Sequence, residues 1–405
     1  MDTNLGADGA VRRQAALAAL PELARRIGED AAGREARREL PYFAFTLFRD
    51  SGLGALRIPV EQGGLGGSLE EVFELVASLA AEEPNVAHAL RLHFDVTETL
   101  LLGPRTAHAE LQVQRVLAGA LYGGASTELG TARPGQIETV LVRHGDHYRM
   151  SGRKYYSTGT AFADYARLNL KDEQGADVIA FIPVDREGVR VLDDWDGMGQ
   201  RMTASGTLEL NEVRVEDDEV LPRASGTLVG RHTGALRQLH LVATAAGIVR
   251  RVYADARDYV LSHGRPVQHS PAPTAREDAF VQQVVGELAA HSLAIDALVR
   301  ENARALDRSA RALLDGDAEA GQRVLEGALV TAKTQLVVAQ LALRAGERLF
   351  EAGGASMTGR KYNFDRHWRS LRTIFSHNPL LHKARVVGDY HLNGTTTHLQ
   401  EGKVF

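Results

Sequence analysis

The sequence predicts an α+β protein of three parts, in which a helical region is followed by a small β-rich domain and then by a helical bundle. Three observations predict this order. Apolar residues recur at spacings of three and four from about residue 10 to 120, the period changes to two from about 121 to 225, and long helical stripes return from about 226 onward. We therefore expect domains at residues 1–120, 121–225 and 226–405.

The N-terminal region contains Ala-rich stretches with one apolar face, among them Val11–Ile27 and Glu70–Ala81. Ser68 and Glu71 open the second stretch with the S-x-x-E pattern of a helix capping box. The glycine-rich segment 63–67 comes just before it. Because a phosphate-binding loop follows a strand, and this segment lies between helical stretches, we interpret it as a turn.

The middle region alternates apolar and polar residues, which is the pattern of strands. Glu138–Arg143 and Tyr148–Met150 flank the turn at 144–147, and this arrangement predicts a β-hairpin. Further β-rich runs, separated by Gly, Pro and Asp, are Asp177–Val184, Val189–Leu192 and Thr207–Val215.

The C-terminal region returns to the helical period. One apolar stripe consists of Phe280, Val281, Val284, Val285, Leu288, Ile295 and Leu298. A second run, Arg323–Phe350, is apolar enough to be buried on most sides. Its apolar surface exceeds what one face of a bundle would bury, so we expect a homotetramer, or at least a dimer.

Composition excludes several classes of protein. Lys and Arg total 47 against 52 Asp and Glu, a net charge of −5, which speaks against a nucleic-acid partner. The absence of cysteine excludes disulfides, thiolate metal sites and cysteine nucleophiles. The 15 histidines contain no metal-binding motif beyond the pair His144 and His147, so we expect no metal. No apolar stretch approaches about 18 residues, and we expect a cytoplasmic protein without a membrane partner.

Four motifs, in this order, resemble the acyl-CoA dehydrogenase superfamily over nearly the whole chain. Ala125–Gly135 resembles its flavin-contacting T-E-P-G-x-G-S loop, and Gly152–Asp164 resembles its G-x-K-x-W-I-T-N-G strand. Gly353–Met357 resembles the glycine loop near the flavin, and Arg366–Arg369 resembles the R-x-x-R before the active-site segment. The resemblance implies an N-terminal α-helical domain, a middle β-barrel or sandwich and a C-terminal four-helix bundle.

The resemblance also implies a flavin. An isoalloxazine ring needs an apolar or aromatic wall on one face and hydrogen bonds along its N1–C2 and C4–N5 edges, because these bonds set its reactivity. Tyr156 would supply the wall. The residues that the resemblance assigns to the cofactor are Ser126, Thr127, Tyr156, Ser157, Thr158 and Arg369.

The chain departs from the dehydrogenases at their catalytic base. A dehydrogenase needs a carboxylate to remove the α-proton of an acyl thioester. Asn378 occupies the usual position of that base, nine residues after Arg369. Arg237 occupies the alternative position, ten residues before Gly247. Neither side chain can abstract a proton.

With Ser157 on the flavin strand and a histidine- and asparagine-containing C-terminus, the chain instead resembles the flavin-dependent monooxygenase branch, which includes dibenzothiophene monooxygenase and its relatives. This implies a two-component system, in which reduced flavin from a separate reductase reacts with O2 to a C4a-hydroperoxide. The substrate would be a small organic molecule that contains sulfur or nitrogen. Val260 stands where FAD-binding relatives carry an arginine, which favours FMN, although FAD stays open.

The same resemblance implies three catalytic residues. Ser157 would hydrogen-bond flavin N5, His391 would face the C4a–N5 edge, and His93 would approach from the substrate side. Histidine suits this chemistry because it exchanges a proton near neutral pH. His93 could also be a structural histidine of a helix.

Two other functions stay open. One is an acyl-CoA dehydrogenase or oxidase with an atypical base, against which the absent carboxylates count. The other is a non-catalytic protein that keeps the fold without flavin, against which the motifs at 125–135 and 157–158 count. A lasting near-ultraviolet band after reduced flavin meets oxygen would distinguish the oxygenase from both.

Overall fold

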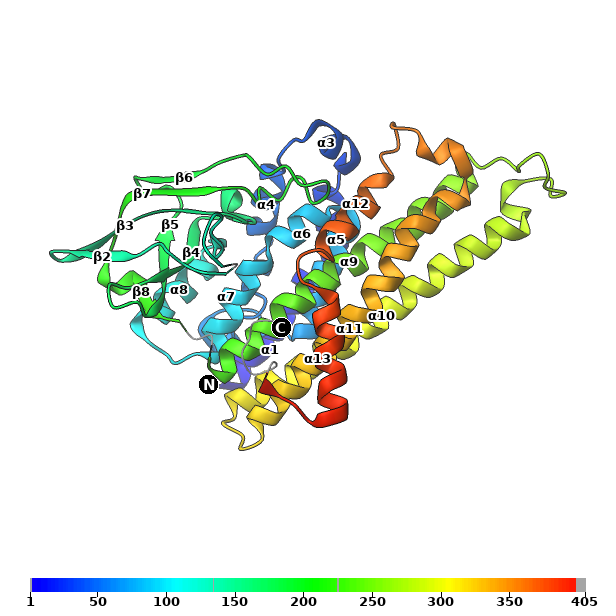
Figure 1. Ribbon diagram of the computed structural model, residues 1–405. Coiled ribbons are helices and arrows are strands. Elements are labelled where there is room, and N and C mark those ends of the chain that lie inside the picture. The colour runs from blue at the N-terminus through cyan, green and yellow to red at the C-terminus, as the bar shows by residue number, and fades with distance from the viewer. Residues whose placement is uncertain (1, 134, 224–225, 398–405) are drawn as a thin grey trace.

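The computed structural model describes residues 2–133, 135–223 and 226–397, and it confirms a helical region, a pair of sheets and a helical bundle in that order (Figure 1). The sheets lie at one end of the molecule, and the long C-terminal helices extend away from them. Among the described residues, no helix is both long and apolar enough to cross a membrane.

The N-terminal helices pack around α5, whose capping box forms as predicted. The Ser68 hydroxyl accepts from the Glu71 N–H, and the Glu71 carboxylate accepts from the Ser68 N–H. The stretch Val11–Ile27 is divided in two, because Pro21 at the start of the second helix has no N–H to continue the first. The helices are α1 (Asp2–Ala18), α2 (Leu20–Ile27), α3 (Ala31–Arg37), α4 (Tyr42–Asp50), α5 (Leu69–Glu82), α6 (Pro84–Ala89), α7 (Arg91–Leu102) and α8 (Ala107–Leu117), with short 3-10 turns η1 (Leu53–Ala55) and η2 (Val60–Gln62).

The middle part is a sandwich of two open sheets rather than a closed barrel. One sheet has the order β1-β4-β5-β8 and the other β2-β3-β7-β6. The strands are β1 (Tyr122–Ala125), β2 (Leu141–His144), β3 (His147–Lys154), β4 (Tyr165–Lys171), β5 (Asp177–Pro183), β6 (Val189–Val191), β7 (Leu208–Val215) and β8 (Val220–Pro222). The predicted hairpin is β2–β3, in which His144 pairs with His147. Apolar side chains of both sheets share one core, which includes Leu141, Met150, Leu168, Leu170 and Val213.

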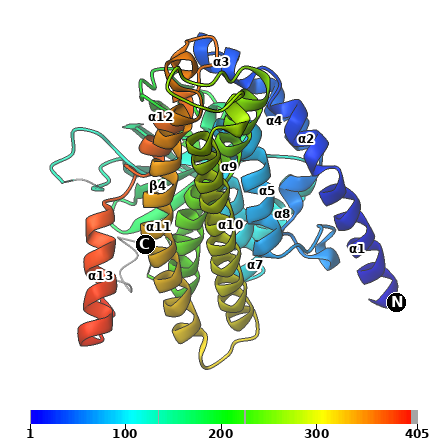
Figure 2. The ribbon, with the colours of Figure 1, turned by 90° about the vertical axis from the view of Figure 1, so that its right-hand side faces the viewer.

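The C-terminal part consists of the long helices α9 (Leu228–Ser262), α10 (Ala279–Leu314) and α11 (Ala320–Arg348), followed by the shorter α12 (Asp365–Ile374) and α13 (Leu380–Asn393). The long helices lie side by side, and α13 lies at the outer edge (Figure 2). Helix α9 runs through the centre and also packs on α5. Gly247 permits this approach, because a Cβ there would come within 2.2 Å of the Ala77 carbonyl.

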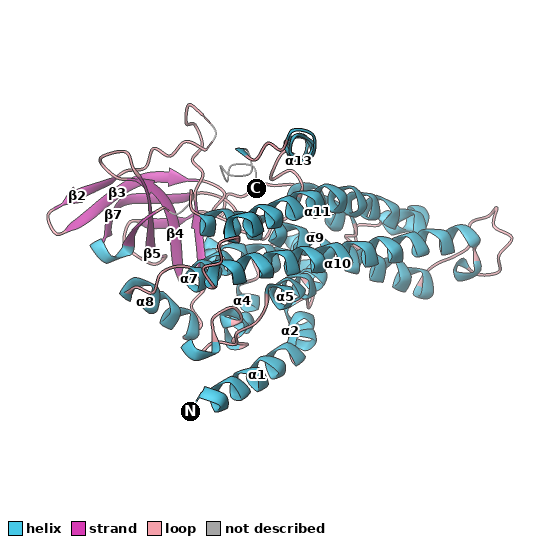
Figure 3. Cartoon of the chain, turned by 90° about the horizontal axis from the view of Figure 1, so that it is seen from below, coloured by secondary structure: helices cyan, strands magenta, loops and turns pink. Residues whose placement is uncertain are grey.

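Helix α7 connects the two halves of the molecule. It contacts β1 of the sandwich and α9 of the bundle, and it lies between the sheets and the long helices (Figure 3). The N-terminal helices and the bundle share one large apolar core, whereas the sandwich has its own. Polar side chains of α7 and α9 therefore meet strand β4 at the junction of these two cores.

Candidate active site

The two segments predicted to contact the flavin edge lie side by side just beyond β1. The N–H of Tyr155 donates to the carbonyl of Thr127 at 2.8 Å, in an isolated antiparallel bridge. Ser126 precedes this bridge with an exposed side chain, and its hydroxyl accepts from the Asn169 amide at 2.7 Å. Ser126 and Thr127 therefore lie beside residues 155–158.

A buried ion pair fixes the segment from Ser126 to Glu128, which we call the flavin-edge loop. Lys154 binds the carboxylate of Glu128 and donates to the carbonyl of Asn169 at 2.7 Å. Glu128 also accepts from the hydroxyl of Thr139 at 2.7 Å and from its N–H at 3.2 Å. Breaking a buried pair is costly, because the remaining charge has lost both water and its partner. The pair thus holds the flavin-edge loop against β3.

Ser157 and Thr158 are held by the loop before β7. The Ser157 hydroxyl donates to the carbonyl of Gly206 at 2.8 Å, and the Ser157 N–H donates to the same oxygen at 3.2 Å. The Thr158 hydroxyl bonds that of Ser205 at 2.7 Å. Ser157 is fully buried, whereas Thr158 is half-buried. Thr158 is therefore the more accessible hydroxyl of the pair.

Tyr156 forms an aromatic surface beside these hydroxyls. Its side chain is 51% exposed, and its φ of 58° lies in the left-handed region that a tyrosine rarely adopts. The ring packs edge-on against Tyr155 and Trp195, at centroid distances of 4.8 and 6.0 Å. Strained, exposed aromatic residues next to hydrogen-bonding groups suit a planar ring ligand. The side chains present thus fit a flavin at this edge.

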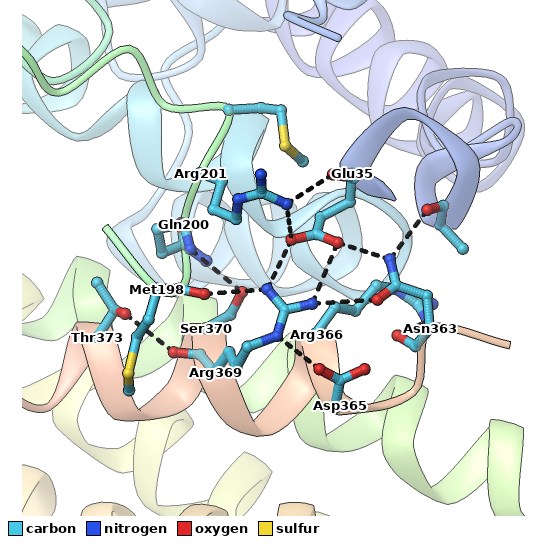
Figure 4. A network of polar contacts seen from close by, with 12 residues as sticks. Glu35, Met198, Gln200, Arg201, Asn363, Asp365, Arg366, Arg369, Ser370 and Thr373 are labelled. Carbon is cyan, nitrogen blue, oxygen red and sulfur yellow. Dashed lines mark hydrogen bonds and ion pairs between the residues drawn. The ribbon is translucent and has the colours of Figure 1, made fainter. Parts of the chain in front are cut away.

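Arg369 does not fit its predicted role as a cofactor contact (Figure 4). Its five N–H donors all have protein acceptors. Nε donates to Asp365 at 2.8 Å, and both Nη atoms donate to Glu35, at 2.7 and 3.2 Å. The remaining two donors bond the carbonyl of Met198 at 2.9 Å and the side chain of Asn363 at 3.0 Å. Since no donor is left for a cofactor, we correct this assignment.

The Arg369 network positions the loop that holds the flavin strand. Buried Glu35 also accepts from Arg201 at 3.2 Å. Burial alone would raise the pKa of Glu35, but hydrogen bonds from Arg369, Asn363 and Arg201 outweigh it and lower the pKa to about 2. The bonded groups span α3, α12 and the loop 193–207 (Figure 4). This loop ends at the acceptors of Ser157 and Thr158.

The two positions where a dehydrogenase carries its base converge in space. The amide of Asn378, between α12 and α13, donates to the side-chain oxygen of Gln238 on α9 at 2.6 Å. Arg237 is the adjacent residue on α9. Hydrogen-bonding amides and a guanidinium thus occupy the place of a carboxylate.

Asp95 of α7 connects Arg237, at the alternative base position, to strand β4 of the sandwich. One carboxylate oxygen accepts from Arg237 at 2.6 Å and the other from Arg167 of β4 at 3.0 Å. Arg167 pairs in register with Gly124 of β1, so this cluster lies next to the flavin-edge loop. Asp95 is 1% exposed, which leaves its two arginine partners nearer the surface.

Arg91, one helical turn before Asp95, bonds His377. Both terminal nitrogens of Arg91 lie 3.3 Å from Nε2 of His377. Because a guanidinium only donates, Nε2 accepts and the neutral ring carries its proton on Nδ1. Desolvation and then the charge of Arg91 lower the pKa of His377 to about 3. His377 is therefore a neutral hydrogen-bond donor at pH 7.

The structure does not bring the three predicted catalytic residues together. His93 is fully buried on the face of α7 opposite Arg91 and Asp95, since two residues span about 200° of a helix. Its Nε2 donates to the carbonyl of Gly54 at 2.8 Å, and burial lowers its pKa to about 4. His391 lies on α13 with an exposed side chain whose ring contacts Tyr390.

Sequence reasoning missed the polar cluster, which consists of Arg91, Asp95, Arg167, Arg237 and His377. Arg91 and Asp95 have the i, i+4 spacing of one helix face, and His377 directly precedes the base position Asn378. Both patterns were available in the sequence. Glu35 gave no such signal, because its partner Arg369 is 334 residues away.

Comparison with known proteins gives matches over nearly the whole chain. The family "Acyl-CoA dehydrogenase, C-terminal domain" matches residues 239–380. A protein from Pseudomonas putida, described as a probable FMNH2-dependent monooxygenase SfnC, is 30% identical over 384 residues, covering 93% of this chain and 95% of the relative. Dibenzothiophene monooxygenase from Mycolicibacterium goodii is 31% identical over 358 residues, covering 85% and 86%.

Solved structures agree with these relatives. FMN-bound TdsC from Paenibacillus sp. A11-2 superposes with a TM-score of 0.87 at 30% identity, covering 94% of this chain and 98% of that one. Methanesulfinate monooxygenase MsuC from Pseudomonas fluorescens superposes with a TM-score of 0.86 at 30% identity, covering 94% and 97%.

Proposed function

This chain belongs to the flavin-dependent monooxygenases that share the acyl-CoA dehydrogenase fold, and we propose from that premise that it oxygenates a small sulfur-containing organic substrate. It takes reduced FMN from a separate reductase and reacts it with molecular oxygen. The flavin supplies two electrons, one oxygen atom enters the substrate, and the other leaves as water. Dibenzothiophene and methanesulfinate, named for two relatives, are both sulfur compounds.

One observation favours oxygenation over dehydrogenation. The two positions at which a dehydrogenase carries its base are occupied here by Asn378 and Arg237, and neither is a carboxylate. Asn378 bonds Gln238, which is the neighbour of Arg237 on α9. The nearest carboxylate in this cluster is Asp95, which is bonded to two arginines and buried. Both oxygens of Asp95 already accept hydrogen bonds from arginine, so neither is placed to take a proton from a substrate. The site therefore suits a reaction that needs no α-proton abstraction.

The residues around the flavin have distinct roles in this proposal. Tyr156 forms the wall of the ring, and Ser126, Thr127 and Thr158 supply hydrogen bonds along its edge. Ser157 donates its proton to Gly206, so its oxygen keeps lone pairs that accept from a donor such as the N5–H of reduced flavin.

His377 is the histidine that we favour as the holder of a proton beside the reacting atoms, and His391 stays the candidate that the sequence predicts. Its contact with Arg91 is open to solvent and fixes its tautomer, with Nδ1 as donor. Asn378, next to it, anchors the segment to α9. A positioned donor of this kind keeps oxygen transfer coupled to substrate instead of releasing hydrogen peroxide.

The predicted homotetramer remains part of the proposal. Phe280 and Leu293 of α10 are 80% and 74% exposed, and large apolar side chains at this exposure suit a subunit contact. Light scattering at micromolar concentration tests this point, and a monomer would contradict it.

A product assay tests the function itself. Purified protein receives reduced FMN from any flavin reductase, with methanesulfinate or a thioether as substrate, and oxygenated product and hydrogen peroxide are both quantified. We expect product formation that depends on FMN. Peroxide without product across sulfur substrates, or turnover of an acyl-CoA, would overturn the proposal.

A further inference from the structure

The polar cluster at the junction of α7, α9 and β4 has an excess of positive charge. Arg167 and Arg237 both pair with the single carboxylate of Asp95, and Arg91 lies one helical turn before Asp95 on α7. Arg91 has no carboxylate within ion-pair distance in the described part of the chain. The next acid on α7, Glu98, is fully buried and already bonded to Arg57 and His232. Three arginines are thus balanced by one carboxylate.

The cluster offers its cations, not its anion, to an incoming molecule. Asp95 is 1% exposed, whereas the side chains of Arg167 and Arg237 are 18% and 30% exposed. The Arg91–His377 contact is likewise open to solvent. Yet surrounding protein and the charge of Arg237 lower the pKa of Arg91 to about 10. Accessible but desolvated guanidinium groups bind anions more strongly than arginines on an open surface.

An unsatisfied donor nearby, the side-chain nitrogen of Gln200, gives a second indication of a ligand. Nδ1 of His88 donates to the side-chain oxygen of Gln200 at 3.0 Å, so Nε2 of the neutral ring is an acceptor. The side-chain nitrogen of Gln200 is a donor that is buried without a hydrogen-bond partner. Burial and then the charge of Arg91 lower the pKa of His88, so His88 lies near Arg91. Buried polar atoms are normally bonded, so such atoms indicate a missing partner.

The cluster also lies at the two positions that the resemblance assigns to a dehydrogenase base. Arg237 stands at the alternative base position and is adjacent to Gln238, which bonds Asn378 at the usual base position. A charged group bound by Arg91 and Arg237 would therefore lie within the substrate site rather than at a distant surface.

We propose that the substrate is an organosulfur anion whose charged group is bound by Arg91 and Arg237. This inference rests on the proposed function and narrows its substrate class. For a sulfinate, the sulfur lone pair forms the new S–O bond as the O–O bond breaks. R–SO2⁻, reduced FMN and O2 then give R–SO3⁻, FMN and water. Uncharged sulfur compounds lack the group that these arginines bind.

Equilibrium binding tests the inference without any turnover. Methanesulfinate and the uncharged dimethyl sulfoxide, which is similar in size, are titrated into the FMN-loaded wild type by calorimetry. The same titrations use Arg91→Met and Arg237→Met. Arg257→Met is the matched control, because Arg257 lies on the same helix α9 with a side chain that is 50% exposed. Arg237→Lys is a second variant that keeps a positive charge beside Asp95, which Arg237→Met removes.

We expect the anion to bind and the sulfoxide not to, and each Met variant to weaken the anion about 10- to 100-fold, the loss for a bond to a charged group. Arg257→Met should change nothing, and Arg237→Lys should retain part of the affinity. Equal binding of both compounds, or anion binding insensitive to both Met variants, overturns the inference. The inference is also overturned if a Met variant weakens the binding of FMN but not of riboflavin, which lacks the phosphate. The arginines would then bind the phosphate of the cofactor. Arginine-dependent binding without oxygenation would instead refute the proposed function alone.

Discussion

The guanidinium of Arg369 donates to both carboxylate oxygens of Glu35, at 2.7 and 3.2 Å, and so joins α12 to α3 across 334 residues of chain. The same guanidinium bonds the carbonyl of Met198 in the loop 193–207. That loop supplies the Gly206 carbonyl which fixes Ser157. The buried ion pair of Arg369 and Glu35 thus sets the position of the segment that contains Ser157 and Thr158.

Glu35 should stabilise the fold in a pH-dependent way. Its pKa is about 2 in the folded chain against a reference value of 4.5, so its contribution is fully present above the unfolded pKa and is lost as pH falls toward 2. Glu35→Gln should therefore lower the free energy of unfolding by about 3 kcal/mol at neutral pH. Near pH 3 less than half of this loss should remain, because pH 3 lies only ~1 unit above the folded pKa, out of the ~2.5 units that separate the two pKa values. Urea unfolding at pH 7, 5 and 3 measures this.

The exposed pair of Glu22 and Arg25 provides a control, since Glu22→Gln should leave stability unchanged. A loss for Glu35→Gln that is the same at pH 7 and pH 3 would show that Glu35 acts through packing rather than through its charge.

His377 and His391 can be separated by paired variants. His377→Ala should lower the ratio of oxygenated product to hydrogen peroxide by about 10²- to 10⁴-fold, because a positioned proton donor is lost. His391→Ala should leave the ratio unchanged, since its ring contacts Tyr390 on α13 rather than the Arg91–His377 pair. FMN binding in both variants should match the wild type. An effect confined to His391→Ala would restore the assignment made from sequence.

Ser157 should matter more for coupling than for binding. Ser157→Ala removes one neutral hydrogen bond and should weaken reduced FMN by about 0.5–1.5 kcal/mol. It should raise the share of oxygen released as peroxide, because the strand loses its bond to Gly206. Thr158→Val is the matched comparison at the accessible hydroxyl. If Ser157→Ala left oxygen consumption and peroxide yield unchanged, its place at N5 would be wrong.

Asn378→Glu should not create a dehydrogenase. The new carboxylate would lie beside Gln238 and near Arg237 and Arg91, and these cations would lower its pKa and its basicity. We expect no reduction of FMN by an acyl-CoA under anaerobic conditions. Flavin bleaching on addition of an acyl-CoA to this variant would mean that only the base separates the chain from dehydrogenases.

Much of the fold was predictable because its signals are local. The capping box at Ser68 and the hairpin at His144–His147 each lie within four residues, and both form. Strand β4 (Tyr165–Lys171) was missed, because three consecutive buried residues hide its alternation. The joining of β1 and β4 in parallel is a long-range pairing that no local pattern specifies.

The site was predictable only in part, for a related reason. Ser126, Thr127 and residues 155–158 came from motifs, and they do lie side by side. Which side chains a histidine contacts depends on how distant elements pack, so the contact of His377 with Arg91 could not be derived from the chain alone. The same holds for Arg369, whose donors are taken by residues far away in sequence.

By the function proposed above, this protein transfers one atom of molecular oxygen to an organosulfur substrate. A single-turnover reaction of the FMNH2-loaded protein with ¹⁸O2 and methanesulfinate, analysed by mass spectrometry, tests it most directly. We expect one ¹⁸O atom in the methanesulfonate product and a yield that falls in His377→Ala. Unlabelled product, or labelled hydrogen peroxide as the sole oxygen product with every sulfur substrate tried, would contradict it.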